Sequence, residues 1–293
     1  MPRFSCLFRV ALALVLFAPR TAFSAPAPEA SPTALQIFDA ALAKFESDRV
    51  ALRKWQYHQT LTTHQVDGGG KVVAKGMWKS IVRAGDTRPL EYTAESMEGK
   101  LSFFKAGAEE PASAPKPATA EKPKAAKDHD EKNQAESAVE AVRKYNLRDR
   151  YIWKHVGNEN ASGESAYVLT FEPKPKQNTR SREERFFGQL AGRLWVSRSD
   201  YSVLKAEAAL QSPAHLFWVI ARVTKFRLTY KLEPDTGSGR LFRHSKATAR
   251  TEVAFPFYVV RQRHWLSTDK YEPRTTQGSR RVNQSANPPS SEP

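Results

Sequence analysis

Residues 192–210, GRLWVSRSDYSVLKAEAAL, contain the pattern that decides the fold class. Apolar and polar residues alternate on both sides of a polar break at Ser199 and Asp200, and period-two alternation around such a break predicts a β-hairpin. Leu194 and Trp195 are nevertheless consecutive, so they point to opposite faces of the strand. Both faces of this hairpin are therefore apolar. Either both sides of its sheet are covered, or one side holds an apolar ligand.

The rest of the chain predicts an antiparallel sheet with helices on one face. Two amphipathic segments read as helices, one starting at Ser31 and Pro32 and one at about residue 135. A hairpin is expected at residues 54–84 and further strands up to residue 272, with residues 216–232 as one long strand. Strands that follow one another in this way favour an α+β meander.

The first helix carries an apolar stripe at helical spacing. Its members are Leu35, Ile37, Phe38, Ala41, Leu42 and Phe45. Such a stripe needs a partner surface, and a sheet beneath the helix would provide it.

Composition divides the chain into one domain with additions. Residues 1–25 are expected to be a signal peptide, residues 26–105 the first helix and first strands, and residues 135–272 the second helix and remaining strands of the same domain. An Ala-, Pro-, Lys- and Glu-rich insertion at 106–134 and a tail at 273–293 are expected to be disordered, because they offer little to bury.

The expected compartment follows from the amino-terminal segment. Arg3 and Arg9 precede an uncharged apolar run that is too short to cross a bilayer, and small residues follow it, which is the pattern of a cleaved secretory signal. The alternative is an uncleaved anchor. The only cysteine, Cys6, lies in this segment, so the exported chain would have neither disulfides nor a thiolate. We expect a periplasmic protein.

Charge favours an anionic partner. The chain has 46 Lys and Arg against 31 Asp and Glu, a formal net charge of +15. An anionic membrane surface or an envelope protein fits this charge and the compartment, whereas nucleic acid fits only the charge. Basic residues at alternate strand positions predict a positive stripe, formed by Lys225, Arg227, Lys231, Arg261 and Arg263. A solvated outer face is the alternative for these residues.

Motifs for catalysis and cofactor binding are missing from the sequence. The seven histidines show no metal-binding spacing, there is no nucleophile elbow, and the glycines at 68–70 lack the Lys-Ser/Thr of a phosphate loop. We expect a protein that is not an enzyme, holds no metal or cofactor, and is a monomer.

A family resemblance rests on two strands around the opening stretch. Tyr167, Leu169, Phe171 and Pro173 lie on the first, and Gly192, Leu194, Trp195, Val196, Asp200, Tyr201, Val203 and Lys205 follow. This pattern resembles the outer-membrane lipoprotein-sorting, or LolA-like, family of periplasmic proteins, in a poorly characterised branch, over residues 145–272. The resemblance implies a strongly curved antiparallel sheet, an incomplete β-barrel, with helices covering one face.

The resemblance also implies a concave apolar cavity that accommodates lipid or lipoprotein acyl chains. The candidate cavity residues are Trp195, Trp218, Phe226, Leu228 and Tyr230. Each of them is also a plausible core residue. Two functions therefore remain open at this point: a carrier or binder of acyl chains, and an envelope protein-interaction module of the same fold whose cavity is filled by side chains.

Overall fold

The computed structural model describes residues 32–83, 89–102, 138–179, 181–217, 221–233 and 243–273. The expected signal peptide, insertion and tail lie outside these residues, apart from Pro273. The helices are α2 (Ala34–Ala51), the short η1 (Leu52–Lys54), α3 (Ala138–Lys144), α4 (Leu147–Arg150) and α5 (Arg182–Phe187). The strands are β1 (Trp55–Val66), β2 (Val72–Arg83), β3 (Pro89–Glu98), β4 (Tyr151–Ala161), β5 (Glu164–Pro173), β6 (Leu190–Ser197), β7 (Val203–Leu210), β8 (Ala214–Phe217), β9 (Ala221–Leu232), β10 (Ser245–Ala254) and β11 (Val259–Pro273).

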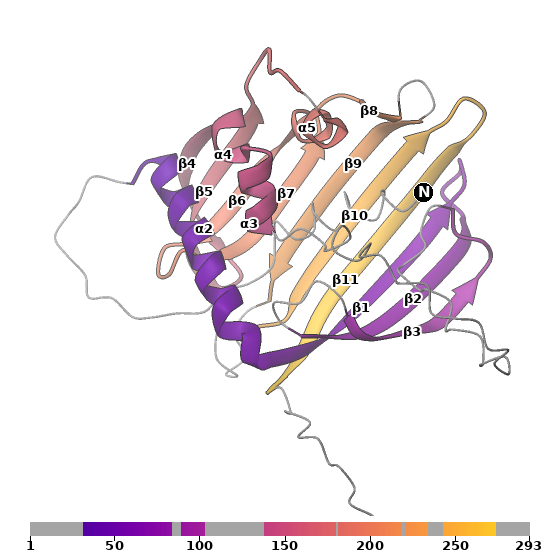
Figure 1. Ribbon diagram of the computed structural model, residues 1–293, viewed down its shortest axis with the longest axis horizontal. Helices are drawn as coiled ribbons and strands as arrows, with labels where there is room; N and C mark the ends of the chain where they lie inside the picture. Colours follow the sequence, from indigo (N-terminus) through magenta and orange to yellow (C-terminus); the bar gives the residue numbers. More distant parts are fainter. Residues whose placement is uncertain are drawn as a thin grey trace, which may run out of the picture.

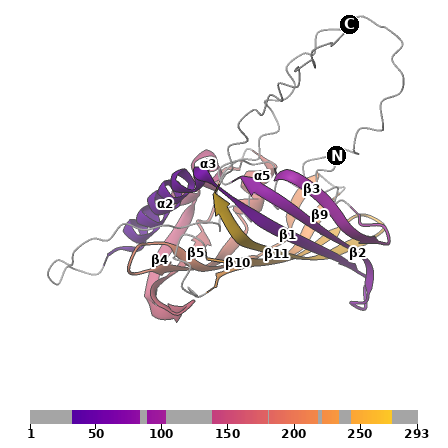
Figure 2. The same ribbon diagram turned by 90° about the horizontal axis from the view of Figure 1, so that it is seen from below.

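All the strands join one antiparallel sheet of 11 strands (Figure 1). Its order is β3-β2-β1-β11-β10-β9-β7-β6-β5-β4, and β8 pairs with β9 outside this path. The sheet is open, with β3 and β4 as its two edges. The helices lie on its concave face, and a view along the sheet shows the strands curving beneath them (Figure 2). The predicted fold class, a curved antiparallel sheet with helices on one face, is confirmed.

The strand order corrects the prediction of a simple meander. The chain forms two meanders, β1–β3 and β4–β11, which join where the first strand pairs with the last. Leu61 lies opposite Leu266 in that pairing. Such a contact between distant segments leaves no mark on the periodicity of either strand.

The prediction of one long strand at residues 216–232 is wrong. β8 and β9 pair antiparallel, with Phe217 opposite Ala221, so the chain reverses direction between them. The apolar residues on both sides of this segment thus come from two strands. The sequence between them has no Gly or Pro to signal the turn.

Helix boundaries also differ from those expected. Thr33, not Ser31, caps α2: its hydroxyl accepts from the backbone N–H of Gln36, whose side chain accepts from the N–H of Thr33. The second helix is divided into α3 and α4 by Asn146, which has a positive φ of 47°. No described helix is long and apolar enough to cross a membrane.

Candidate ligand cavity

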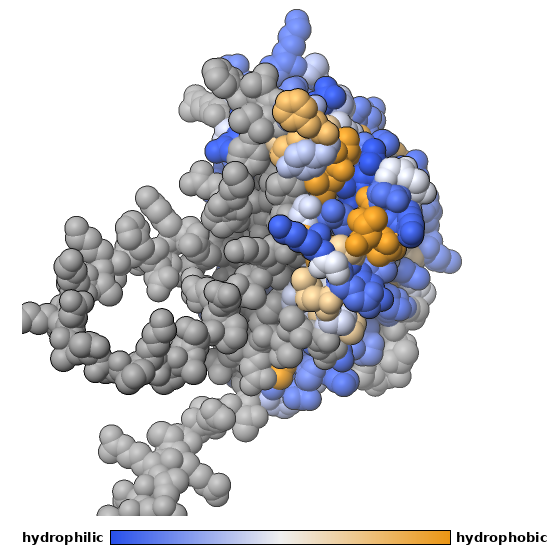
Figure 3. Space-filling view, turned by 90° about the vertical axis from the view of Figure 1, so that its right-hand side faces the viewer, coloured by the Kyte–Doolittle hydropathy of each residue, from blue (hydrophilic) through white to orange (hydrophobic). Residues whose placement is uncertain are grey.

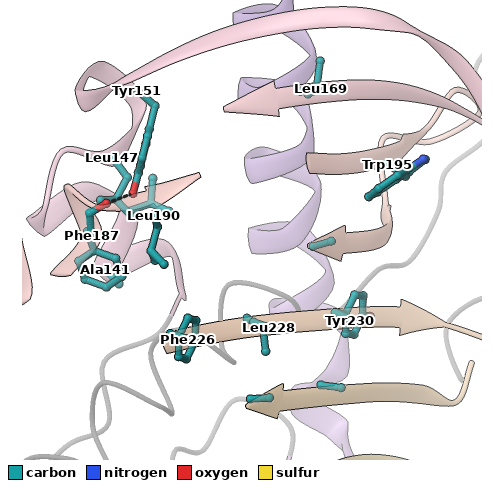
Figure 4. Close-up of a cluster of buried hydrophobic side chains, with 14 of the residues drawn as sticks. Ala141, Leu147, Tyr151, Leu169, Phe187, Leu190, Trp195, Phe226, Leu228 and Tyr230 are labelled. Carbon is teal, nitrogen blue, oxygen red and sulfur yellow. Dashed lines mark hydrogen bonds between the residues drawn. The ribbon is translucent and has the colours of Figure 1, made fainter. Parts of the chain in front are cut away.

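An apolar cavity of about 100 Å³ lies between the helices and the concave face of the sheet. Helices α2, α3, α4 and α5 contribute one wall, and strands β4, β5, β6, β7 and β9 contribute the other. Figure 4 shows part of this lining, including Leu147, Phe187 and Leu228. Its lining residues are Phe38, Ala41, Leu42, Phe45, Val142, Leu147, Tyr151, Trp153, Phe171, Phe187, Leu190, Leu194, Val203, Ala206, Glu207, Ala208, Phe226 and Leu228.

Helix α2 provides much of the cavity wall. Phe38 is buried, and its ring centroid lies 4.3 Å from that of Trp153 on β4. Leu42 and Phe45, one and two turns further along, are only partly buried. These two side chains line the cavity and remain partly accessible to solvent.

The polar atoms of the aromatic side chains point away from the cavity. The Tyr151 hydroxyl donates to the carbonyl of Phe187 at 2.5 Å, and the Trp153 indole donates to the carbonyl of Arg148 at 3.1 Å. Burial raises the pKa of Tyr151, so the hydroxyl stays protonated as a donor. With these groups bonded to the backbone, the rings present carbon to the cavity, which favours a dry interior.

Small residues on the sheet create the free space. Ala206 and Ala208 lie on β7 beside Gly192 on β6. A Cβ atom on Gly192 would lie 1.9 Å from the carbonyl oxygen of Glu207 and 2.8 Å from Cζ of Phe171. Close packing therefore requires a glycine at position 192, because any side chain there would clash with β7 and with Phe171.

One charged residue occurs among those that line the cavity. Glu207 has its carboxylate 2.7 Å from Nζ of Lys205. Because it alternates along β7 with Ala206 and Ala208, its side chain leaves the sheet on the opposite face. The cavity itself thus offers contacts for hydrocarbon and none for metal or phosphate, and no cluster of three metal-ligating residues occurs in the described part of the chain.

Two ion pairs hold α2 against the other helices. Arg148 of α4 forms a fork with Asp39, with N–O distances of 2.7 and 2.8 Å, and these bonds raise the pKa of Arg148. Arg143 of α3 lies 2.8 Å from Glu46. Both pairs are exposed to solvent, so they are weak and sensitive to salt. These pairs therefore restrain α2 only weakly, and the burial of Ile37 and Phe38 holds the helix more firmly.

Only some of the predicted cavity residues line the cavity in the structure. Phe226 and Leu228 line the cavity. Tyr230 is buried further along β9 and does not line it. Trp218 lies outside the described residues.

Trp195 is buried on the other face of the sheet from Leu194. Its indole donates to Glu159 at 2.8 Å, and Nζ of Lys205 lies 4.1 Å from its ring centroid. Figure 4 shows its side chain pointing away from the cavity cluster. The opening question thus has a structural answer: one face of the hairpin lines the cavity, and on the other Trp195 is covered by charged side chains.

The predicted basic residues lie on the convex face, opposite Phe226 and Leu228. Lys225 and Arg261 both pair with Glu252, at 3.3 and 3.1 Å. Burial alone would raise the pKa of Glu252, but hydrogen bonds from Thr224 and Lys225 outweigh it and lower the pKa. Lys231 is exposed and lies opposite Lys246.

Arg227 and Arg263 belong to a row across the sheet. Arg250 on β10 lies directly opposite Arg227 on one side and Arg263 on the other. Among the described residues, none of these three guanidinium groups has a carboxylate partner.

The sequence-based site list omitted residues from α2 and β4–β6. The stripe of α2 was recognised as apolar, but the strand that it would cover was not, so Phe38 was not paired with Trp153. Phe171 was named only as part of the family pattern on β5. The pairing of β5 with β6, which sets Phe171 opposite Gly192, could not be located from either strand alone.

No family model matches the chain, and no curated protein matches it. Among solved structures, a LolA superfamily protein from Nitrosomonas europaea is 15% identical, with a TM-score of 0.31 over 84% of this chain and 95% of the other. A putative outer membrane lipoprotein-sorting protein domain from Vibrio parahaemolyticus is 13% identical, with a TM-score of 0.30 over 84% and 94%.

A DUF1329 family protein from Desulfovibrio piger is also similar. It is 13% identical, with a TM-score of 0.31 over 85% of this chain and 96% of the other. The first two names are those of the family that the Gly192–Lys205 pattern resembles. Likenesses at this distance carry no information about a ligand.

Proposed function

We propose that this protein is a periplasmic, non-catalytic binder or carrier of lipid or lipoprotein acyl chains, and that the chain enters between α2 and the sheet. The observation that carries the proposal is the cavity, whose walls are hydrocarbon and whose aromatic polar atoms are bonded to backbone carbonyls. An apolar ligand gains free energy there by leaving water, without loss of any hydrogen bond.

The cavity volume limits what the closed form can hold. A water needs about 10–15 Å³ by the same measure, so 100 Å³ has room for roughly seven such volumes. An acyl segment of about seven methylenes, one for each such volume, would gain about 6 kcal/mol at about 0.8 kcal/mol for each buried methylene. A longer acyl chain requires α2 to move outward. The exposed ion pairs of Asp39 and Glu46 oppose such a movement only weakly.

Filling the cavity tests the proposal. Ala206→Leu adds three carbons to a residue that lines the cavity. Ala249→Leu also adds three carbons on the concave face, but at a buried residue that does not line the cavity. Uptake of 11-(dansylamino)undecanoic acid is followed by fluorescence, and stability by thermal unfolding. We expect Ala206→Leu to weaken uptake at least tenfold with an unchanged or higher Tm, because the added atoms occupy free space. Ala249→Leu should keep uptake and lower Tm, because it overpacks a filled site.

The alternative of a filled cavity predicts a different outcome. A protein-interaction module would show no uptake in the wild type, and Ala206→Leu would lower Tm as much as Ala249→Leu. Equal uptake by the wild type and Ala206→Leu would also contradict the proposal. Mass spectrometry of lipid that co-purifies with the protein would identify the natural ligand.

A further inference from the structure

One end of the sheet exposes apolar side chains that the fold does not explain. The β1–β2 turn and the β10–β11 turn lie side by side there, because β1 pairs with β11. The exposed apolar residues at this end are Val72, Val73, Phe257, Tyr258 and Val259. Figure 3 looks at this side of the molecule and shows apolar patches set among hydrophilic side chains. We call these five residues the apolar edge.

The β10–β11 turn has an unusual composition. Its backbone is closed by a hydrogen bond from the N–H of Phe255 to the carbonyl of Tyr258. Phe255 packs against the core and stacks on Tyr258 with ring centroids 4.7 Å apart, so both rings support the turn. Phe257, however, is 96% exposed at the tip. Gly, Asn, Asp or Ser would suit this position in a turn, so its ring gains nothing from the fold.

Cations surround the apolar edge. Lys71 and Arg222 are exposed beside it, and the guanidinium groups of Arg261 and Arg263 reach the β1–β2 turn, 3.9 Å from where Cβ atoms on Gly68 and Gly70 would lie.

The nearby carboxylates are already engaged. Asp67 accepts from the N–H groups of Gly69 and Lys71, and Glu252 pairs with Arg261. The four cations nevertheless outnumber these two carboxylates, so the edge presents net positive charge around exposed aromatic rings.

The row formed by Arg227, Arg250 and Arg263 continues this charge across the convex face. Like charges directly opposite one another on neighbouring strands destabilise a sheet. The free protein bears this cost, and an anionic surface would remove it.

We propose that the apolar edge docks on a bilayer that contains anionic phospholipid, with Phe257 and Tyr258 at the depth of the headgroups and Arg261 and Arg263 against the phosphates. Aromatic rings flanked by basic residues suit the membrane–water interface. A protein partner fits less well, because a stable interface buries about 800 Å² on each side and one projecting turn offers little of that. The proposal does not depend on the cavity, and the two are measured separately.

Co-sedimentation of the full chain with vesicles tests the docking. Vesicles of phosphatidylcholine alone are compared with vesicles that also contain phosphatidylglycerol. We expect binding only to the anionic vesicles. Phe257→Ser with Tyr258→Ser should weaken it by roughly tenfold to a hundredfold, because two apolar groups no longer leave water. Arg263→Glu changes the charge by two units, and each unit near such a surface contributes roughly fivefold, so binding should weaken about 25-fold.

Matched controls come from the distant edge strand β4. Ile152→Ser with Val156→Ser removes apolar side chains that are 40% and 54% exposed, and Lys154→Glu reverses an exposed charge. Both should bind like the wild type. Equal losses in these controls, or no binding of the wild type to anionic vesicles, would overturn the proposal. So would sedimentation showing that the edge variants convert a dimer to a monomer, which would assign the edge to a second copy.

A single label gives a direct reading of the contact. Because Cys6 is the only cysteine, Phe257→Cys in a Cys6→Ser background carries one environment-sensitive fluorophore. Its emission should shift to the blue on anionic vesicles, whereas the same label at Ile152→Cys should not respond. A label at position 257 that stays in water on bound vesicles would contradict the proposed orientation.

Discussion

The concave face of the sheet has two halves that are both covered but are built from different side chains. Over β4 to β7 and β9 it is apolar and encloses the cavity. Over β1 and β11 buried polar residues lie among apolar ones such as Leu266, and we call this the polar half. Thr63 Oγ1 lies 3.0 Å from Nδ1 of His264, and both are buried. Ala249 lies opposite both His264 and Leu228, so the two halves share one continuous face.

Hydrogen bonds close the polar half. The backbone N–H of Ser102 donates to Gln65 at 2.7 Å, and Gln262 donates to the carbonyl of Ser102 at 2.6 Å, so the chain after β3 is tied across the face. Opening this half would leave buried polar groups without partners. Opening the apolar half would mainly expose hydrocarbon, because the side chains that line the cavity are mostly apolar. If the protein binds acyl chains as proposed, we expect the ligand to enter on the apolar side and the polar side to stay fixed.

The largest expected effect comes from a truncation in the apolar half. Phe226→Ala removes a ring that packs edge-on against Phe186, with centroids 5.2 Å apart. We expect the free energy of unfolding to fall by about 3–5 kcal/mol, because the folded state loses the transfer free energy of the ring and also contains a larger cavity. This corresponds to a fall in Tm of roughly 10 °C. Uptake of longer acyl probes should increase in the same variant. Unchanged uptake with the full loss of stability would show that Phe226 belongs to a closed core.

The polar half should make stability depend on pH. Burial lowers the pKa of His264 to about 3, against about 6.5 in the unfolded chain. Between these values the unfolded chain binds a proton that the folded one does not. The stability present above pH 6.5 is therefore lost as the pH falls, by about 2 kcal/mol at pH 5.

The variant His264→Gln isolates this contribution. Denaturant unfolding at pH 7.5 and pH 5 is measured for both proteins, and the variant should lose less stability on acidification. Asp48, whose pKa burial raises to about 8, titrates in both proteins and cancels in the difference. Parallel pH profiles would mean that His264 is protonated in the folded state.

A smaller loss is expected from Thr63→Val. The change keeps the shape of the side chain and removes the hydrogen bond to His264, which should cost about 1 kcal/mol. Uptake of the fatty-acid probe should not change, since the proposed site lies in the other half. A variant that lost uptake would show that the two halves are coupled.

The smallest equilibrium effect is expected from Asp39→Asn, which breaks the fork from Arg148 to α2. Because the pair is exposed, stability should fall by less than about 1 kcal/mol. Stopped-flow fluorescence should nevertheless show faster probe release, since α2 is then less restrained. Release at the wild-type rate would exclude outward movement of α2 as the path of exit.

Local pattern predicted the parts of this molecule that depend on neighbouring residues. The hairpin around Ser199 and Asp200, the first hairpin and the apolar stripe of α2 were all recognised. Period-two alternation also placed Phe226 and Leu228 on one face. The six-residue helix α5 was missed, because one and a half turns of mostly charged residues show no stripe.

The site as a whole depends on contacts that no local pattern contains. The cavity needs α2 to lie over strands more than a hundred residues away, and the polar half needs β1 beside β11. Thr63 and His264 are polar residues on strands, which a local analysis assigns to solvent. Only their pairing across the sheet reveals that they satisfy each other. Trp195 was assigned to the cavity because a large apolar residue on a strand can belong to either face of the sheet, and the sequence does not show which face is concave.

Anomalous diffraction from crystals soaked with 12-bromododecanoic acid tests the central claim most directly. Bromine marks the end of the acyl chain, so its position shows which half of the concave face takes the ligand. We predict a bromine peak between α2 and the sheet, in contact with Phe38, Trp153 or Leu228, and none over Thr63 and His264. A bromine peak over the polar half, or no peak in crystals of a protein that binds the acid in solution, would contradict the account.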